Sequence, residues 1–138
     1  TTWPVDSLLS IRKKLNNKLQ KYNLGYWQSE FCILENTDDI GGGVKRDLGI
    51  NTALYVARVI HADLTIANAS SWQWWTALTN ADYKDGLIYL DTGDNKDLFN
   101  LNKMKSDGDF HDSKLLWAFG NFSRFVRPKM KRVKIYSG

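Results

Sequence analysis

Two short apolar and aromatic stretches alternate with two amphipathic helical patterns, and this order limits the possible fold more than any other feature of the sequence. Leucine and isoleucine residues recur at helical spacing between Asp6, a suitable helix cap, and Asn23, a suitable helix end. Residues 26–34 have the character of a strand, residues 48–67 that of a long helix, and residues 69–75 that of a second strand. Helix, strand, helix and strand in this order are typical of an α/β unit with a parallel sheet.

A long polar excursion follows the second strand. Residues 77–110 contain one convincing extended piece, 86–91, and segments of this length in compact domains are usually functional or disordered. A third helix is predicted for residues 113–126, with Asp112 as its cap and Pro128 after its end.

The last residues read as the start of a further strand, because Val133 and Ile135 alternate with polar neighbours over residues 132–136. Two strands cannot close a barrel, and a doubly wound sheet normally needs more strands, so we expect the rest of the sheet to lie outside this chain. The chain opens at Thr1 without an initiator methionine, which suggests a segment of a longer protein.

The composition is that of a globular protein. The chain has 138 residues, of which 43% are hydrophobic and 13% aromatic, and its formal net charge is +4. The excess of basic residues is interspersed with Asp and Asn, so we expect a solvated face and no nucleic-acid partner. No apolar run approaches the ~18 residues of a membrane span, and no signal peptide is visible. The single Cys32 excludes an intrachain disulfide and a zinc site of the multi-cysteine kind, and it is expected to be a small core residue.

Other residues that often carry chemistry have simpler interpretations here. His61 lies inside the predicted second helix, and Asp63 follows at a spacing that does not share its face, so no metal motif is indicated. His111 precedes Asp and Ser at a helix start, where capping explains the pattern better than a catalytic triad. The Gly run 41–43 lacks the Lys-Ser or Lys-Thr of a phosphate loop. The sequence therefore predicts no metal site and no cofactor.

Glu30 is the most informative single residue. It stands where an apolar strand is predicted to end, and ionised groups avoid such strands unless they are paired or used. An ordinary ion pair and a functional carboxylate both fit this pattern.

The second predicted strand packs three indoles into four positions. Alternation places Trp72 and Trp74 on one face, with Gln73 and Trp75 on the other, and Trp75 is expected to belong to the core. A face of Trp72 and Trp74 suits stacking on the C–H face of a sugar ring, with indole N–H groups and an amide binding hydroxyls. Ordinary core packing of all three indoles is the alternative.

Taken together, these segments resemble the C-terminal part of the catalytic domain of glycoside hydrolase family 30. Residues 27–31 (Trp-Gln-Ser-Glu-Phe) resemble the seventh-strand motif, in which a Ser-Glu pair presents the catalytic nucleophile. Residues 47–57 are similar to the following helix, residues 67–75 to the eighth strand, and residues 114–128 to the helix that closes the barrel.

This resemblance implies an α/β fold: residues 1–128 would be the C-terminal portion of a (β/α)8 TIM barrel, with its last two strands and helices. Residues 129–138 would begin a β-sandwich strand. The implied activity is that of a retaining β-glycosidase with Glu30 as nucleophile. Trp74 matches the tryptophan wall of the sugar subsite next to the scissile bond. The other residues implied to contact the substrate are Trp72, Gln73, Trp27 and Tyr83.

The resemblance also implies what this chain lacks. Glu30 must stay ionised, so hydrogen-bond donors are expected near it, with Tyr26 and Tyr83 as candidates. The family's acid/base carboxylate follows an Asn on strand four, and no residue here matches it, because the remainder of the barrel is missing from this chain. We therefore expect no glycosidase activity from these 138 residues alone.

The implied partner is a β-linked carbohydrate polymer or oligosaccharide. Residues 72–75 and 82–86 look most like the bacterial branch that includes endo-β-1,6-galactanases, although 82–85 equally fit a plain turn. Polymer-degrading members are exported, so a secreted or periplasmic location is expected. Two alternatives remain: a non-catalytic carbohydrate-binding protein on the same scaffold, and a small α/β interaction domain with a fortuitous match.

Overall fold

The computed structural model describes residues 5–34, 36–37, 39–91, 108–133 and 135, and it has the predicted mixed α/β character. The helices are α1 (Val5–Lys21), α2 (Ile50–Thr65) and α3 (Lys114–Phe125). The strands are β1 (Trp27–Phe31), β2 (Ser71–Trp74), β3 (Leu78–Thr79), β4 (Ile88–Asp91) and β5 (Asp109–Asp112).

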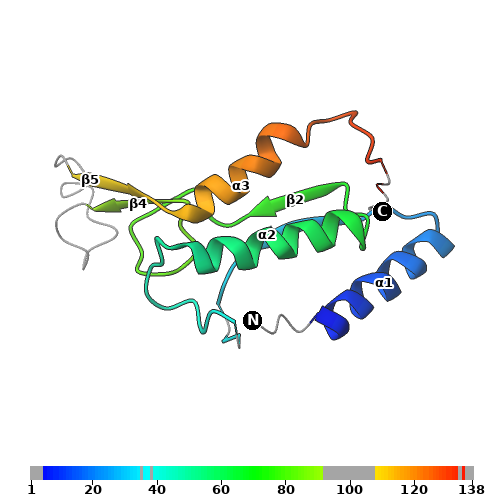
Figure 1. Ribbon diagram of the computed structural model, residues 1–138, viewed down its shortest axis with the longest axis horizontal. Coiled ribbons are helices and arrows are strands. Elements are labelled where there is room, and N and C mark those ends of the chain that lie inside the picture. Colours follow the sequence, from blue (N-terminus) through cyan, green and yellow to red (C-terminus); the bar gives the residue numbers. More distant parts are fainter. Residues whose placement is uncertain (1–4, 35, 38, 92–107, 134, 136–138) are drawn as a thin grey trace.

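The centre of the fold is the parallel pair β1 and β2, as the sequence predicted. The pairing runs from Trp27 opposite Ser71 to Phe31 opposite Trp74, and the register shifts between Gln28 and Phe31. Helices α2 and α3 run along this pair and pack against each other (Figure 1). The buried core between the helices and the strands consists of Ile33, Ala53, Val56, Ile60, Leu87 and Leu115.

Two of the three neighbouring indoles belong to this core. The rings of Trp72 and Trp74 stack with centroids 6.1 Å apart, and Phe31 lies 5.5 Å from Trp72. The indole of Trp72 also lies 6.0 Å from Phe119 of α3. Trp75, in contrast, is 57% exposed.

The prediction that Trp75 is the core indole is therefore wrong, and Trp72 and Trp74 are the ones that pack inside. Alternation along a strand separates two faces but does not tell which face the helices cover. Here α2 and α3 cover the face of Trp72 and Trp74, whose indole N–H groups are satisfied there by the Asp63 carboxylate at 2.9 Å and the Asp85 carbonyl at 2.7 Å.

A second, smaller sheet follows the parallel pair. Strand β4, which the sequence predicted as the extended piece, lies between β3, to which it runs parallel, and β5, to which it runs antiparallel. The β4–β5 pair projects from the body at the end where β2 terminates (Figure 1). Residues 92–107 of the predicted excursion lie outside the described residues.

Helix α1 lies beside the C-terminal part of α2 and is attached to it by an ion pair (Figure 1). The Arg12 guanidinium contacts the buried Asp63 carboxylate at 2.6 Å. The helix ends at Lys21, and Asn23, which was predicted to end it, adopts a left-handed conformation (φ 52°) just beyond, while the Leu24 N–H donates to the Leu19 carbonyl. It begins at Val5, so Asp6 lies in the first turn and the prediction of Asp6 as cap is wrong.

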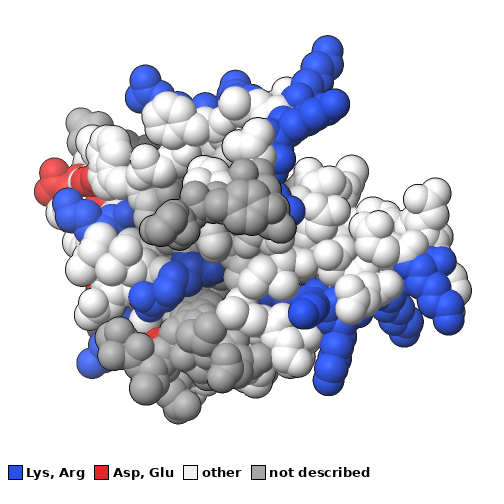
Figure 2. Space-filling model, turned by 45° about the vertical axis from the view of Figure 1, so that its right-hand side comes forward, with Lys and Arg blue, Asp and Glu red and all other residues white. Residues whose placement is uncertain are grey.

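On the face of the molecule that Figure 2 shows, basic side chains are spread out rather than gathered in one stripe. Figure 2 shows Lys and Arg side chains with uncharged surface between them. Those of α1 include the exposed residues Lys13, Lys14, Lys18 and Lys21. Within the described part of the chain, no helix is long and apolar enough to cross a membrane.

The cap of α3 is Ser113 and not Asp112. The Ser113 hydroxyl accepts a hydrogen bond from the Leu116 N–H and lies 3.0 Å from the carbonyl oxygens of Gly86 and Leu87, which accept its proton. The Asp112 carboxylate instead accepts a hydrogen bond from the Trp117 indole. Ser113 is preferred because it is buried and faces both the helix end and β4, whereas Asp112 belongs to exposed β5.

The predicted strand at 132–136 falls partly outside the described residues, namely at Lys134 and Tyr136. Its described residues Arg132, Val133 and Ile135 do not form a strand.

Replacing Ser113 by Ala should lower the free energy of unfolding by about 1–2 kcal/mol, because one hydroxyl both caps α3 and satisfies a buried carbonyl. Urea denaturation of the full-length protein measures this effect. The matched control is Ser123→Ala on the exposed part of α3, which should change stability by less than about 0.5 kcal/mol. Equal effects of the two substitutions would contradict this account of the cap.

Candidate active site at the carboxyl ends of β1 and β2

Glu30 is exposed near the carboxyl end of β1. Its neighbour Phe31 packs against the core, whereas Glu30 stays exposed in the part of β1 where the register with β2 shifts. The Gln28 amide donates a hydrogen bond to the Glu30 carbonyl at 2.7 Å, and the Tyr26 hydroxyl donates to the Gln28 side chain. Tyr26 thus supports the backbone of Glu30 through Gln28. From the sequence, the Tyr26 hydroxyl was expected to donate to the Glu30 carboxylate, but the hydroxyl donates to Gln28 instead.

A pocket of about 210 Å³ opens beyond the ends of β1 and β2. We call it the strand-end pocket. Two of its walls are aromatic, since Trp75 is 57% and Tyr83 is 41% exposed. Its lining residues are Leu34, Trp75, Thr76, Thr79, Ala81, Tyr83 and Asp85.

A second carboxylate, Asp85, lies between the strand-end pocket and the end of β1. It is only 6% exposed, and one of its oxygens accepts a hydrogen bond from the Ile33 N–H at 2.8 Å. Burial raises the pKa of Asp85, and the Ile33 hydrogen bond offsets part of this rise. The pKa of the Cys32 thiol is raised by burial and, to a smaller extent, by the negative charges of Asp85 and Glu30.

Residues 82–86, which carry Tyr83 and Asp85 and form one wall of the strand-end pocket, are held in place by the loop of residues 40–43. The Lys84 ammonium donates hydrogen bonds to the carbonyls of Ile40, at 2.7 Å, and Gly42, and its backbone N–H donates to Gly43. Gly43 packs so closely against the segment that follows β1 that a Cβ atom there would lie 1.9 Å from the Ile33 carbonyl oxygen. The backbone of residues 82–85 is therefore fixed relative to the end of β1.

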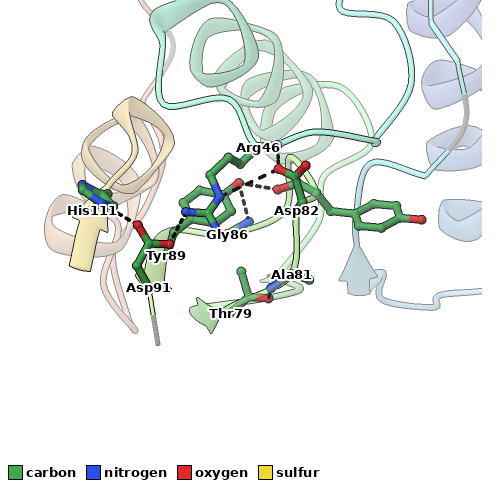
Figure 3. A network of polar contacts seen from close by, with 9 residues as sticks. Arg46, Thr79, Ala81, Asp82, Gly86, Tyr89, Asp91 and His111 are labelled. Carbon is green, nitrogen blue, oxygen red and sulfur yellow. Dashed lines mark hydrogen bonds and ion pairs between the residues drawn. The ribbon is translucent and has the colours of Figure 1, made fainter. Parts of the chain in front are cut away.

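A charged network reinforces the same wall from the other side (Figure 3). The Arg46 guanidinium donates to Asp91 at 2.7 Å and lies over the Tyr89 ring at 4.9 Å, while the Arg46 backbone N–H donates to Asp82 at 2.9 Å. The Asp91 carboxylate also contacts His111 of β5 at 2.8 Å.

Tyr89 links this network to the pocket wall. Its hydroxyl donates to the Tyr83 carbonyl and accepts from the Gly86 N–H at 3.1 Å. The side chain is completely buried, and burial raises its pKa to about 12. Gly86 is required here, because a Cβ atom would come within 2.6 Å of the Tyr89 ring.

The structure brings together only some of the residues expected to contact a substrate. Gln73 is exposed on β2, on the face opposite Trp72 and Trp74, and Tyr83 lines the strand-end pocket. Trp27 is 67% exposed but lies at the start of β1, at the far end from the pocket.

Two residues of the pocket, Trp75 and Asp85, were not assigned to the site from the sequence. Trp75 was recognisable in principle, because alternation already placed it on the face opposite Trp72 and Trp74. Asp85 lies in the segment 82–86 that resembles the bacterial branch, but this segment equally fits a turn, so the residue itself was not singled out.

His61 and a further hollow lie away from the strand-end pocket. His61 is exposed on α2 and borders a hollow of about 380 Å³ between α1 and α2, lined mainly by apolar residues such as Leu9 and Leu54. Across the residues that the structure describes, no three His, Cys, Asp or Glu side chains are grouped to hold a metal ion.

A comparison with protein families identifies the family of this chain. The family model described as O-glycosyl hydrolase family 30 matches residues 1–89, and the chain belongs to this family of glycoside hydrolases. This membership rules out the interpretation as an interaction domain with a fortuitous match. A search of curated proteins found no match.

Two solved structures are similar to the chain. A conserved exported protein from Bacteroides fragilis is 35% identical with a TM-score of 0.69, over 97% of this chain and 28% of that one. The catalytic domain of GH30 xylanase C from Talaromyces cellulolyticus is 22% identical with a TM-score of 0.50, over 76% of this chain and 20% of that one, and it supports the fold alone. The chain thus spans well under a third of the length of these two proteins.

Acid should weaken the contact between β4 and the Arg46 loop. The hydrogen bond from Arg46, helped by His111, holds the pKa of Asp91 below its usual value. The stabilisation by Asp91 is therefore present above the unfolded pKa of about 3.9 and is lost as the pH falls through the lower folded pKa. The stability difference between the wild type and Asp91→Asn, from urea midpoints of the full-length protein, should be larger at neutral pH than at about pH 3.

The control for this measurement is Asp109→Asn, which removes the carboxylate opposite Asp91 on β5. A difference between wild type and Asp91→Asn that stays the same at both pH values would refute the role of the Asp91 charge.

Proposed function

We propose that Glu30 is the nucleophile of a retaining β-glycosidase that cleaves a β-linked polysaccharide, with β-1,6-galactan as the favoured substrate. The observation that carries the proposal is the position of Glu30: an exposed carboxylate near the carboxyl end of a parallel strand, in a chain of glycoside hydrolase family 30. In a (β/α)8 barrel, catalytic groups project from the carboxyl ends of the strands.

In this proposal the reaction has two displacements. A Glu30 oxygen attacks the anomeric carbon, and the leaving oxygen takes a proton from a second carboxylic acid. That second group then removes a proton from water, which attacks the anomeric carbon and releases Glu30 as a carboxylate. The second group is proposed to come from strand four of the barrel, outside the residues of this chain.

The exposed aromatic residues provide the sugar-binding surface of this proposal. Trp75 has an exposed indole just after the end of β2, and the exposed Tyr83 ring lines the same strand-end pocket. Gln73 supplies an amide on the same face of β2 as Trp75. Trp72 and Trp74 are proposed to act from the core side, by fixing β2, because their rings are packed against Phe31 and Phe119.

The proposed domain organisation follows from the same assignment. Residues 1–128 are proposed to form the last part of the barrel, and residues 129–138 to lead into a β-sandwich. Because the similar Bacteroides fragilis protein is described as exported, we propose a secreted or periplasmic location for this protein as well.

A non-catalytic carbohydrate-binding role is the second candidate. It is favoured by the exposed aromatic pair Trp75 and Tyr83, which needs no catalytic partner to hold a sugar. This role predicts sugar binding that survives Glu30→Gln and no hydrolysis by the full-length protein.

Replacing Glu30 by Gln in the full-length protein should lower kcat for β-1,6-galactan by roughly 10⁴-fold or more, since removal of a covalent nucleophile has effects of this scale. Release of reducing sugar measures the rate. Asp112→Asn is the control, because this carboxylate binds Trp117 and does not line the strand-end pocket.

Two further results belong to this test. Glu30→Gly with added azide should yield a glycosyl azide of inverted configuration, because azide attacks from the side that Glu30 vacates. The 138 residues alone should show no turnover. Hydrolysis by this chain alone that is lost on Glu30→Gln would disprove the need for a second carboxylate from elsewhere.

A further inference from the structure

Asp85 is a nearly buried carboxylate with an uncommitted oxygen. One oxygen accepts the Ile33 N–H, and no donor in the described part of the chain contacts the other. Every fully buried side-chain oxygen or nitrogen among the described residues has a hydrogen-bond partner, so this second oxygen must reach accessible surface. The hollow that Asp85 lines is the strand-end pocket.

The surroundings of Asp85 contain no compensating positive charge. Among the described residues that line the strand-end pocket, none is Lys, Arg or His. The nearest basic residue in sequence, Lys84, directs its ammonium group to the carbonyls of Ile40 and Gly42. A buried carboxylate without a cation is costly, and the raised pKa of Asp85 reflects this cost.

A group that enters the strand-end pocket therefore meets aromatic surfaces and one anionic acceptor. Sugar hydroxyls are donors of the kind that such an acceptor binds, and a hydrogen bond to a charged acceptor is stronger than a neutral one. A carboxylate on the sugar would face Asp85 with like charge and without a basic partner.

We infer that Asp85 accepts a hydrogen bond from a hydroxyl of the sugar in the strand-end pocket and thereby selects neutral sugars over uronic acids. This inference rests on the proposed function, because it takes the strand-end pocket, whose lining does not include Glu30, as a sugar subsite of the enzyme. It narrows the substrate to a neutral glycan at that position and makes Asp85 a specificity-determining residue.

A purely structural role for Asp85 is separable from this one. The substitution Asp85→Asn keeps an oxygen for the Ile33 N–H and removes the charge, so the tie between the pocket wall and β1 is retained. Because burial disfavours the charged carboxylate, this variant should be at least as stable as the wild type at neutral pH. A functional role predicts lost sugar affinity in a protein that is not destabilised.

The test measures binding in the full-length Glu30→Gln protein, so that turnover does not interfere. Calorimetry compares three neutral β-linked disaccharides, galactobiose, gentiobiose and xylobiose, and the uronic acid counterparts of the two hexose disaccharides. With Asp85 present, the neutral member of each pair should bind about 10-fold more tightly or better, and Asp85→Asn should weaken neutral binding by about 10-fold and narrow that preference.

Asp82→Asn is the matched control. Asp82 belongs to the same wall but bonds Arg46 and does not line the strand-end pocket, so its loss should leave the preference unchanged. An unchanged preference in Asp85→Asn, a wild-type preference for uronic acids, or no binding of any disaccharide would overturn the inference.

Failure of this inference is distinguishable from failure of the proposed function. Azide rescue at position 30 reports on the nucleophile and does not depend on Asp85. If azide rescues the Glu30→Gly variant but the preference for neutral sugars is the same with and without the Asp85 carboxylate, the specificity role of Asp85 is rejected and Glu30 remains the nucleophile.

Discussion

The whole arrangement depends on the packing of α2 and α3 over one face of the parallel pair β1 and β2. Phe31, Trp72 and Trp74 fill that interface with aromatic rings, and the two indole N–H groups are satisfied there. Burial of such large side chains favours this face strongly over the other. Gln73 and Trp75 point away from this packed face, and Glu30 is exposed where the register of β1 shifts, so the core packing decides which groups are available for chemistry.

The second constraint is the rigid wall of residues 82–86. Lys84, Arg46 and Tyr89 each tie this short segment to a different neighbour, and Gly43 and Gly86 allow the close approach of backbone and ring. Such ties fix side chains near the geometry that a binding site needs, at the cost of a buried and only partly satisfied Asp85. A cost of this kind is more readily explained by ligand binding than by folding.

Much of the fold followed from the sequence, because strong periodicity defined three helices and the two parallel strands. The site followed less completely. Alternation separated Trp75 from Trp72 and Trp74, but which face the helices cover is set by long-range packing that one strand does not encode. The cap of α3 was misassigned to Asp112 for a similar reason, since only the fold buries Ser113 against Gly86. Asp85 became visible only when folding placed it against Ile33.

The central claim is that Glu30 becomes covalently bonded to the sugar. The most direct measurement treats the full-length protein with an activated 2-deoxy-2-fluoro-β-galactoside, which slows release of the glycosyl intermediate, and identifies the modified peptide by mass spectrometry. The account predicts one added fluorosugar, located on Glu30. Turnover of galactan without a label on Glu30, or with the label on another carboxylate, would contradict it.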